Sequence, residues 1–125
     1  MVKKLGIVAV TVSVFACAVP LLAHHGVASF DTTKTLKLTG VVTDYVWSNP
    51  HVLVKLDAKD ESGTVTRWVV EVWNPVTQSA SGWTKNSFKP GDEVVADVTP
   101  AKNGRTVGEF RGRVEVNGKA VGTAR

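Results

Sequence analysis

The fold is decided above all by one stretch, LKLTGVVTDYVW at residues 36–47. Leucine alternates with lysine before Gly40, and β-branched and aromatic residues dominate after it, which is typical of a β-strand. A glycine inside so long a run predicts a bulge or a sharp bend. We therefore expect one long, bent strand that can serve two halves of a β-barrel.

The residues after this stretch predict a meander of strands. Pro50 ends the first strand because it has no amide donor. Apolar residues mark a second strand at 52–56, and a glycine turn at 60–63 leads into a third strand at 64–73. Trp68 alternates with two valines on one face of the third strand, so we expect Trp68 in the core.

The second half of the chain predicts a short helix and further strands. Asn74 is a good N-cap and Pro75 fits the first helical position, so we expect a helix to about Ser81. Trp83 and Phe88 are then expected to plug one end of the barrel. Strands should follow at residues 93–99, 106–116 and 119–123, the last after an Asn-Gly hairpin signal.

The order of these elements predicts the fold class. Three strands, a helix and two strands form the order of an OB-fold, an all-β, five-stranded Greek-key barrel with one short helix. A small β-sandwich or an up-and-down barrel is the alternative. The predicted organisation is a signal peptide at residues 1–23, an N-terminal arm at 24–34 and one OB-like β-barrel domain at 35–125. Phe30 is expected to hold the arm against the domain.

The N-terminus shows the three parts of an export signal. Lys3 and Lys4 form a basic start, residues 5–19 form an apolar run, and a short exit ends at Ala23. The run is short for a membrane-spanning helix, which needs about 20 apolar residues. We therefore expect cleavage near Ala23, no membrane span after processing, and a periplasmic or secreted protein. The alternative is a lipoprotein anchored at Cys17.

Composition argues against several classes of function. Removal of Lys3 and Lys4 with the signal lowers the formal net charge from +4 to +2, which gives little support to nucleic-acid binding. Cys17 is the only cysteine, so the processed chain would have no disulfide, thiolate nucleophile or zinc-thiolate site. No serine lies in a Gly-x-Ser-x-Gly turn, and no catalytic constellation stands out. The sequence favours a binding module over an enzyme.

The three histidines, His24, His25 and His51, form a candidate metal site. With His24 first in the processed chain, its α-amine and imidazole can chelate one ion, and His51 could supply a third nitrogen. Nitrogen ligands in a planar arrangement favour Cu(II) or Ni(II), so copper is the candidate cofactor. Met1 is the only methionine, which excludes a Cu(I) site built on thioethers. The simpler interpretation is a solvated arm and a histidine that only caps a strand.

Aromatic residues form a second candidate site. Trp47 and Trp73 stand at the ends of predicted strands, and Tyr45 shares the face of Trp47 if the strand is regular. Exposed aromatic rings can stack on sugars or bases. The alternative function is therefore a metal-free periplasmic adaptor that binds a glycan, a peptide or another envelope partner.

Several short motifs in a fixed order resemble a family of small secreted bacterial proteins known only as a domain of unknown function. They are His-His after the signal, Phe30-Asp31, residues 38–42, the Trp-Ser-Asn-Pro-His segment at 47–51, and residues 82–84 and 88–94. The resemblance covers essentially the whole processed chain. It implies an exported protein of one domain, and it brings no activity with it.

Overall fold

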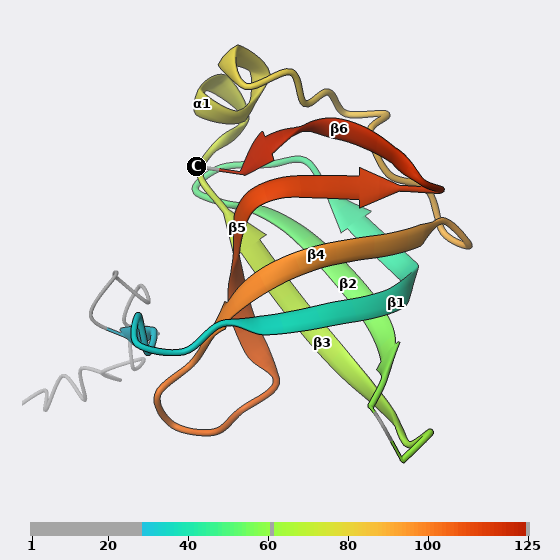
Figure 1. Cartoon of the computed structure of the whole chain (residues 1–125). Helices are drawn as coiled ribbons and strands as arrows, with labels where there is room; N and C mark the ends of the chain where they lie inside the picture. Colours follow the sequence, from blue (N-terminus) through green and yellow to red (C-terminus); the bar gives the residue numbers. More distant parts are fainter. Residues whose placement is uncertain (1–28, 61, 125) are drawn as a thin grey trace, which may run out of the picture.

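The described residues, 29–60 and 62–124, form six β-strands and one short helix in this computed structural model (Figure 1). The elements are β1 (Leu36–Val46), β2 (Val52–Lys59), β3 (Val65–Val72), α1 (Pro75–Ala80), β4 (Glu93–Pro100), β5 (Val107–Val116) and β6 (Lys119–Ala124). Each predicted strand and the predicted helix are present, with small differences at their ends.

The strands close into a barrel of five. Neighbours follow the order β3-β2-β1-β4-β5-β6, and all of these pairs are antiparallel. A parallel pairing between β3 and β5, from Val69↔Val107 to Glu71↔Glu109, closes the ring. β6 pairs with the second half of β5 and lies outside the ring. The predicted OB-like barrel is confirmed.

The first strand bends as expected, but the bulge is not at Gly40. β1 pairs with β4 up to Val41 and with β2 from Gly40 onwards, so it serves both halves of the barrel. The register shifts between Val42 and Asp44. At Gly40 a Cβ atom would lie 2.9 Å from the carbonyl oxygen of Asp57, so this glycine instead permits the close approach of β2. The glycine at position 40 therefore meets a steric requirement and does not mark the bulge.

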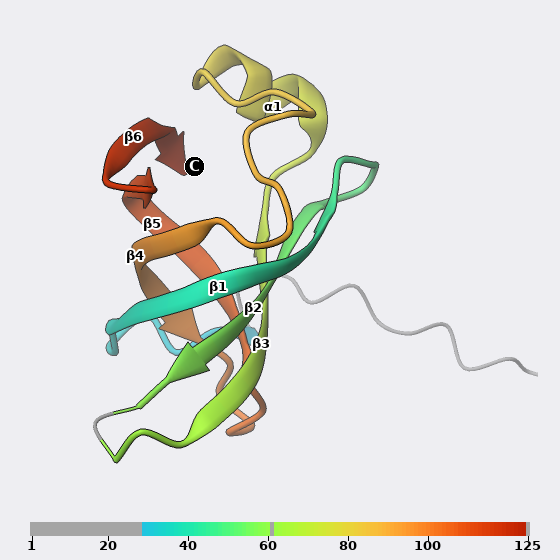
Figure 2. The same cartoon turned by 90° about the vertical axis from the view of Figure 1, so that its right-hand side faces the viewer.

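One end of the barrel is closed by α1 and by the segment that follows it. The Asn74 side chain accepts a hydrogen bond of 3.0 Å from the amide of Thr77, which confirms the predicted N-cap. Trp83 and Phe88 are buried under this end, as predicted. Figure 2 shows α1 and the β1–β2 connection at this end, with the β2–β3 and β4–β5 connections at the other.

Trp68 is less buried than the sequence pattern predicts. Val70 and Val72 on the same face of β3 are buried, whereas Trp68 is half-buried and packs against the core. Trp68 stands near the end of the barrel that α1 does not cover. The alternation therefore predicted its direction correctly, but not its burial.

The last part of the arm is held against the β4–β5 connection. Phe30 is buried and forms an isolated bridge with Ala101, and the amide of Asp31 donates to the carbonyl of Pro100 at 2.8 Å. The predicted role of Phe30 is confirmed. The predicted signal peptide and the first part of the arm lie outside the described residues. Within residues 29–60 and 62–124, no helix is long and apolar enough to cross a membrane.

Acid should destabilise the barrel partly through Asp60. Its carboxylate accepts hydrogen bonds from the Ser62 hydroxyl and from the amides of Ser62 and Thr64, and these bonds lower the pKa of Asp60. A lowered folded-state pKa gives stability that is present above the unfolded value of about 4 and is lost as the pH falls through the folded value. We expect the melting temperature of Asp60→Asn, which keeps the acceptor oxygen, to fall less steeply than that of the wild type below about pH 4.

Thermal melts followed by circular dichroism between neutral and strongly acidic pH check this expectation. The melting temperatures at neutral pH serve as the reference for each protein. Identical acid slopes for the two proteins would contradict it.

Candidate functional site

The predicted site residues outside the arm gather at the α1 end of the barrel. Trp47 follows the last residue of β1, and His51 precedes β2, so both belong to the connection between these strands. Trp73 follows β3, and its carbonyl accepts a hydrogen bond of 3.3 Å from the amide of Val52, next to His51. The pairing of β2 with β3 thus places His51, just before β2, beside Trp73, just after β3.

His51 is half-buried and oriented by the backbone. Its Nδ1 atom lies 3.2 Å from the carbonyl oxygen of Val72. This contact fits the tautomer with hydrogen on Nδ1, which donates to the carbonyl. The other ring nitrogen, Nε2, then keeps its lone pair. Metal-binding histidines are usually held in this way.

Tyr45 and Trp47 belong to a row of aromatic rings. The Tyr45 ring lies 6.1 Å from Trp47 and 5.0 Å from Phe88, and Phe88 lies 4.9 Å from Trp83, measured between ring centroids. The Tyr45 hydroxyl donates a hydrogen bond of 2.8 Å to the carbonyl of Thr84, and burial raises the pKa of Tyr45. Tyr45 therefore ties β1 to the segment after α1. Trp47, half-buried at the outer end of the row, is better placed than Tyr45 to meet a ligand.

Trp73 stands apart from this row. Its side chain is 45% exposed, and none of the ring contacts among the described residues includes it. It directly precedes the N-cap of α1, and Val76 in the first turn is 79% exposed. We call Trp73 and Val76 the α1 patch. The three aromatic residues predicted as one ligand site are thus separated: Tyr45 and Trp47 form a pair, and Trp73 belongs to the α1 patch.

The structure places only one of the three predicted metal ligands. His24 and His25 lie outside the described residues, and within residues 29–60 and 62–124 no three His, Cys, Asp or Glu side chains gather to hold a metal ion. From Phe30, which is fixed against Ala101, an extended chain back to His25 spans at most about 18 Å. A site of three histidines stays a prediction.

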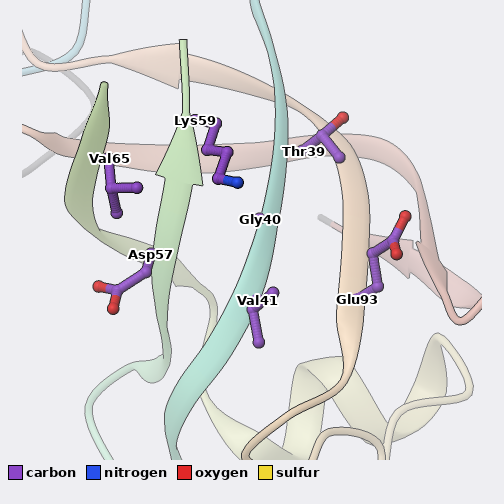
Figure 3. A pocket seen from close by; sticks show the side chains of 7 residues that line it. All are labelled: Thr39, Gly40, Val41, Asp57, Lys59, Val65 and Glu93. Carbon is purple, nitrogen blue, oxygen red and sulfur yellow. The ribbon is translucent and has the colours of Figure 1, made fainter. Parts of the chain in front are cut away.

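Two hollows lie away from these residues. One, of about 500 Å³, is a depression on the outer face across β4, β1, β2 and β3, lined by the backbone of Gly40 and by side chains around it (Figure 3). The other, of about 550 Å³, surrounds Trp68 at the barrel end opposite α1. The sequence reasoning missed both. The second hollow could have been inferred from the position of Trp68 near the beginning of its strand, because an inward side chain at that position stands at the rim of a barrel.

The comparisons with known proteins agree with the resemblance found in the sequence. The model of a family of unknown function (DUF6152) matches residues 11–110. No curated protein and no solved structure matches the chain.

Proposed function

Because the chain belongs to the family of unknown function DUF6152, we propose a role from the site itself: an exported binding module for a transition metal ion, with copper as the first candidate. The ligands in this proposal are His51 and the histidines His24 and His25 of the processed N-terminus. Export places the protein in the periplasm or outside the cell. This location rests on the N-terminal signal pattern.

The observation that carries the proposal is the contact between His51 Nδ1 and the carbonyl of Val72, 3.2 Å long. Metal-binding histidines usually donate their second ring nitrogen to a carbonyl or carboxylate, which fixes the ring and raises its basicity. His51 has this arrangement at a strand end. To complete a metal site, His51 needs only further nitrogen ligands from another part of the chain.

The processed N-terminus would supply such partners. Cleavage after Ala23 gives His24 a free α-amine, which binds one ion together with its imidazole. Cleavage one residue earlier gives Ala23-His24-His25, in which an imidazole at the third position, the amine and two backbone amides complete a square plane. Both forms favour Cu(II).

Copper titration of the exported protein tests the proposal. The N-terminus is first identified by intact mass, and Cu(II) binding is then measured by calorimetry. In the form that begins with His24, we expect His51→Ala to weaken binding by about tenfold, because the substitution removes one of the proposed nitrogen ligands. In the form that begins with Ala23, the arm alone supplies four nitrogens, and His51→Ala should bind copper like the wild type. Trp73→Ala, a change beside His51 that removes no nitrogen ligand, should bind copper like the wild type.

Binding should also weaken towards pH 5, since the α-amine titrates near ~8 and imidazole near ~6.5, and both must lose a proton to bind the ion. Unchanged affinity in His51→Ala, in protein shown by intact mass to begin with His24, would contradict a site of three nitrogens.

The α1 patch favours a second candidate function, a metal-free adaptor. Trp73 and Val76 place exposed apolar surface at the start of α1, and exposed aromatic residues are frequent in binding surfaces. Titrations with peptidoglycan fragments and envelope peptides, followed by tryptophan fluorescence, would test it. Binding is expected in the wild type and lost in Trp73→Ala. Equal binding by both proteins would remove its basis.

A further inference from the structure

The barrel end opposite α1 has no helix over it and contains the hollow around Trp68. Its volume of about 550 Å³ is within the range of 300–1,000 Å³ common for small-molecule sites. The side chains used below are those of Thr35, Lys59, Thr66, Trp68 and Thr106. None of them belongs to the site at His51.

The hollow exists because two β-ladders stop short of this end. The β1–β2 ladder reaches only to Gly40↔Ala58, so the first residues of β1 pair with β4 alone. The β3–β5 ladder starts at Val69↔Val107, beyond Trp68. Among the described strands, the first halves of β1 and β3 thus each have one edge outside any ladder. Backbone donors and acceptors are therefore available around the hollow.

Trp68 supplies a fixed apolar wall. Its ring packs against the core and lies close to β5, since a Cβ atom at Gly108 would be 3.6 Å from its Cζ3 atom. Trp68 is only half-buried, and it lines the hollow. A flat ring fixed in this way can pack against the C–H groups of a sugar ring, and OB-folds are known to bind oligosaccharides.

Polar groups around Trp68 are free to bind a ligand. Within the described residues, the hydroxyls of Thr35, Thr66 and Thr106 form no side-chain hydrogen bond, and Lys59 forms no ion pair. Lys59 extends from the end of β2 towards β1 (Figure 3), and it lines both hollows. Asp60, the acidic residue at the rim, already accepts bonds from Ser62 and Thr64.

We propose that this hollow binds a sugar ring that carries a carboxylate, such as a uronic acid. The ring would pack on Trp68, its hydroxyls would bond to the threonines, and its carboxylate would meet Lys59. Nucleic acid fits less well, because single strands usually need several stacked aromatic rings along a basic groove. The inference is independent of the proposed metal site, because none of these side chains is a proposed metal ligand and His51 lies at the α1 end of the barrel.

Nuclear magnetic resonance titrations of the whole processed protein test the proposal, with digalacturonate as the probe. We expect the Trp68 indole N–H signal, assigned with Trp68→Phe, to shift while that of Trp73 stays in place. Cellobiose, which is uncharged, should bind more weakly. Lys59→Gln should lower the affinity for digalacturonate by about tenfold, and Thr66→Val, which keeps the side-chain shape, by about fivefold.

Lys85→Gln is the matched control, because Lys85 is also exposed, forms no ion pair among the described residues, and lies in the segment after α1. It removes the same charge at the other end of the barrel and should leave the affinity unchanged. Equal weakening by Lys59→Gln and Lys85→Gln would overturn the proposal, since it would indicate attraction by net charge alone. A shift of the Trp68 signal by oligothymidylate but not by digalacturonate would overturn it too.

Discussion

Replacing Trp83 with alanine is expected to lower the free energy of unfolding by about 4 kcal/mol, the usual range for a large buried aromatic residue. The Trp83 side chain is 1% exposed, and its ring lies 4.9 Å from Phe88 and 6.1 Å from Phe110 between centroids. Its removal leaves a cavity under α1 that the closed barrel cannot collapse to fill. Urea denaturation followed by circular dichroism measures the loss.

The same substitution should also disturb the candidate site. Trp83, Phe88, Tyr45 and Trp47 form one row of ring contacts from the core to the β1–β2 connection. Loss of the Trp83 ring removes the packing that supports Phe88 and, through it, Tyr45 and Trp47. Trp73→Ala is the control, because this tryptophan is exposed, and it should change stability by no more than about 0.5 kcal/mol. Similar values for the two variants would show that Trp83 does not hold this end together.

Gly122→Ala is expected to cost about 3 kcal/mol, from a steric clash and from backbone strain together. Gly122 has a φ of 131°, and a Cβ atom there would lie 2.3 Å from the carbonyl oxygen of Ser81 and 2.9 Å from Cδ1 of Trp83. Both neighbours are held in place, one by the C-cap of α1 and one by the core. β6 would have to move away from α1, although Thr123 donates a hydrogen bond to Ser81.

Gly91→Ala separates the two causes. Gly91 has a φ of 94°, but nothing lies within 4 Å of the position that its Cβ would take. This variant should lose only the strain energy, about 1 kcal/mol. Equal losses at both glycines, measured by urea denaturation, would mean that the packing of β6 against Ser81 and Trp83 contributes nothing.

Much of the fold could be predicted because its signals are local. Asn74 and Pro75 begin α1 through a side-chain hydrogen bond and a fixed φ, both of which act within one turn of helix. The alternation around Val70 and Val72 gave the inward face of β3 because side chains alternate along any strand. The order of strands and helix then left few arrangements besides the OB-like barrel.

The candidate site was predicted only in part. His51 and Trp73 lie at one barrel end because β2 and β3 pair in register, as a meander requires. The division between the Tyr45–Trp47 pair and the α1 patch was not foreseen, because it depends on which side of each strand end is covered by the segment after α1. The hydrogen bond from His51 to the carbonyl of Val72 could not be predicted either, since it depends on the exact register of β2 and β3.

The amino-acid sequence alone therefore accounts for the strands, the helix, the fold class and the family, since each depends on residue type, short spacing or the order of motifs. Only the folded chain decides where the barrel closes, why Gly40 must lack a side chain, and why Trp68 stands at an open rim. These features arise where β1 meets β2 and where β3 meets β5. Contacts between residues so far apart along the chain depend on the final distance between strands, and no local pattern encodes that distance.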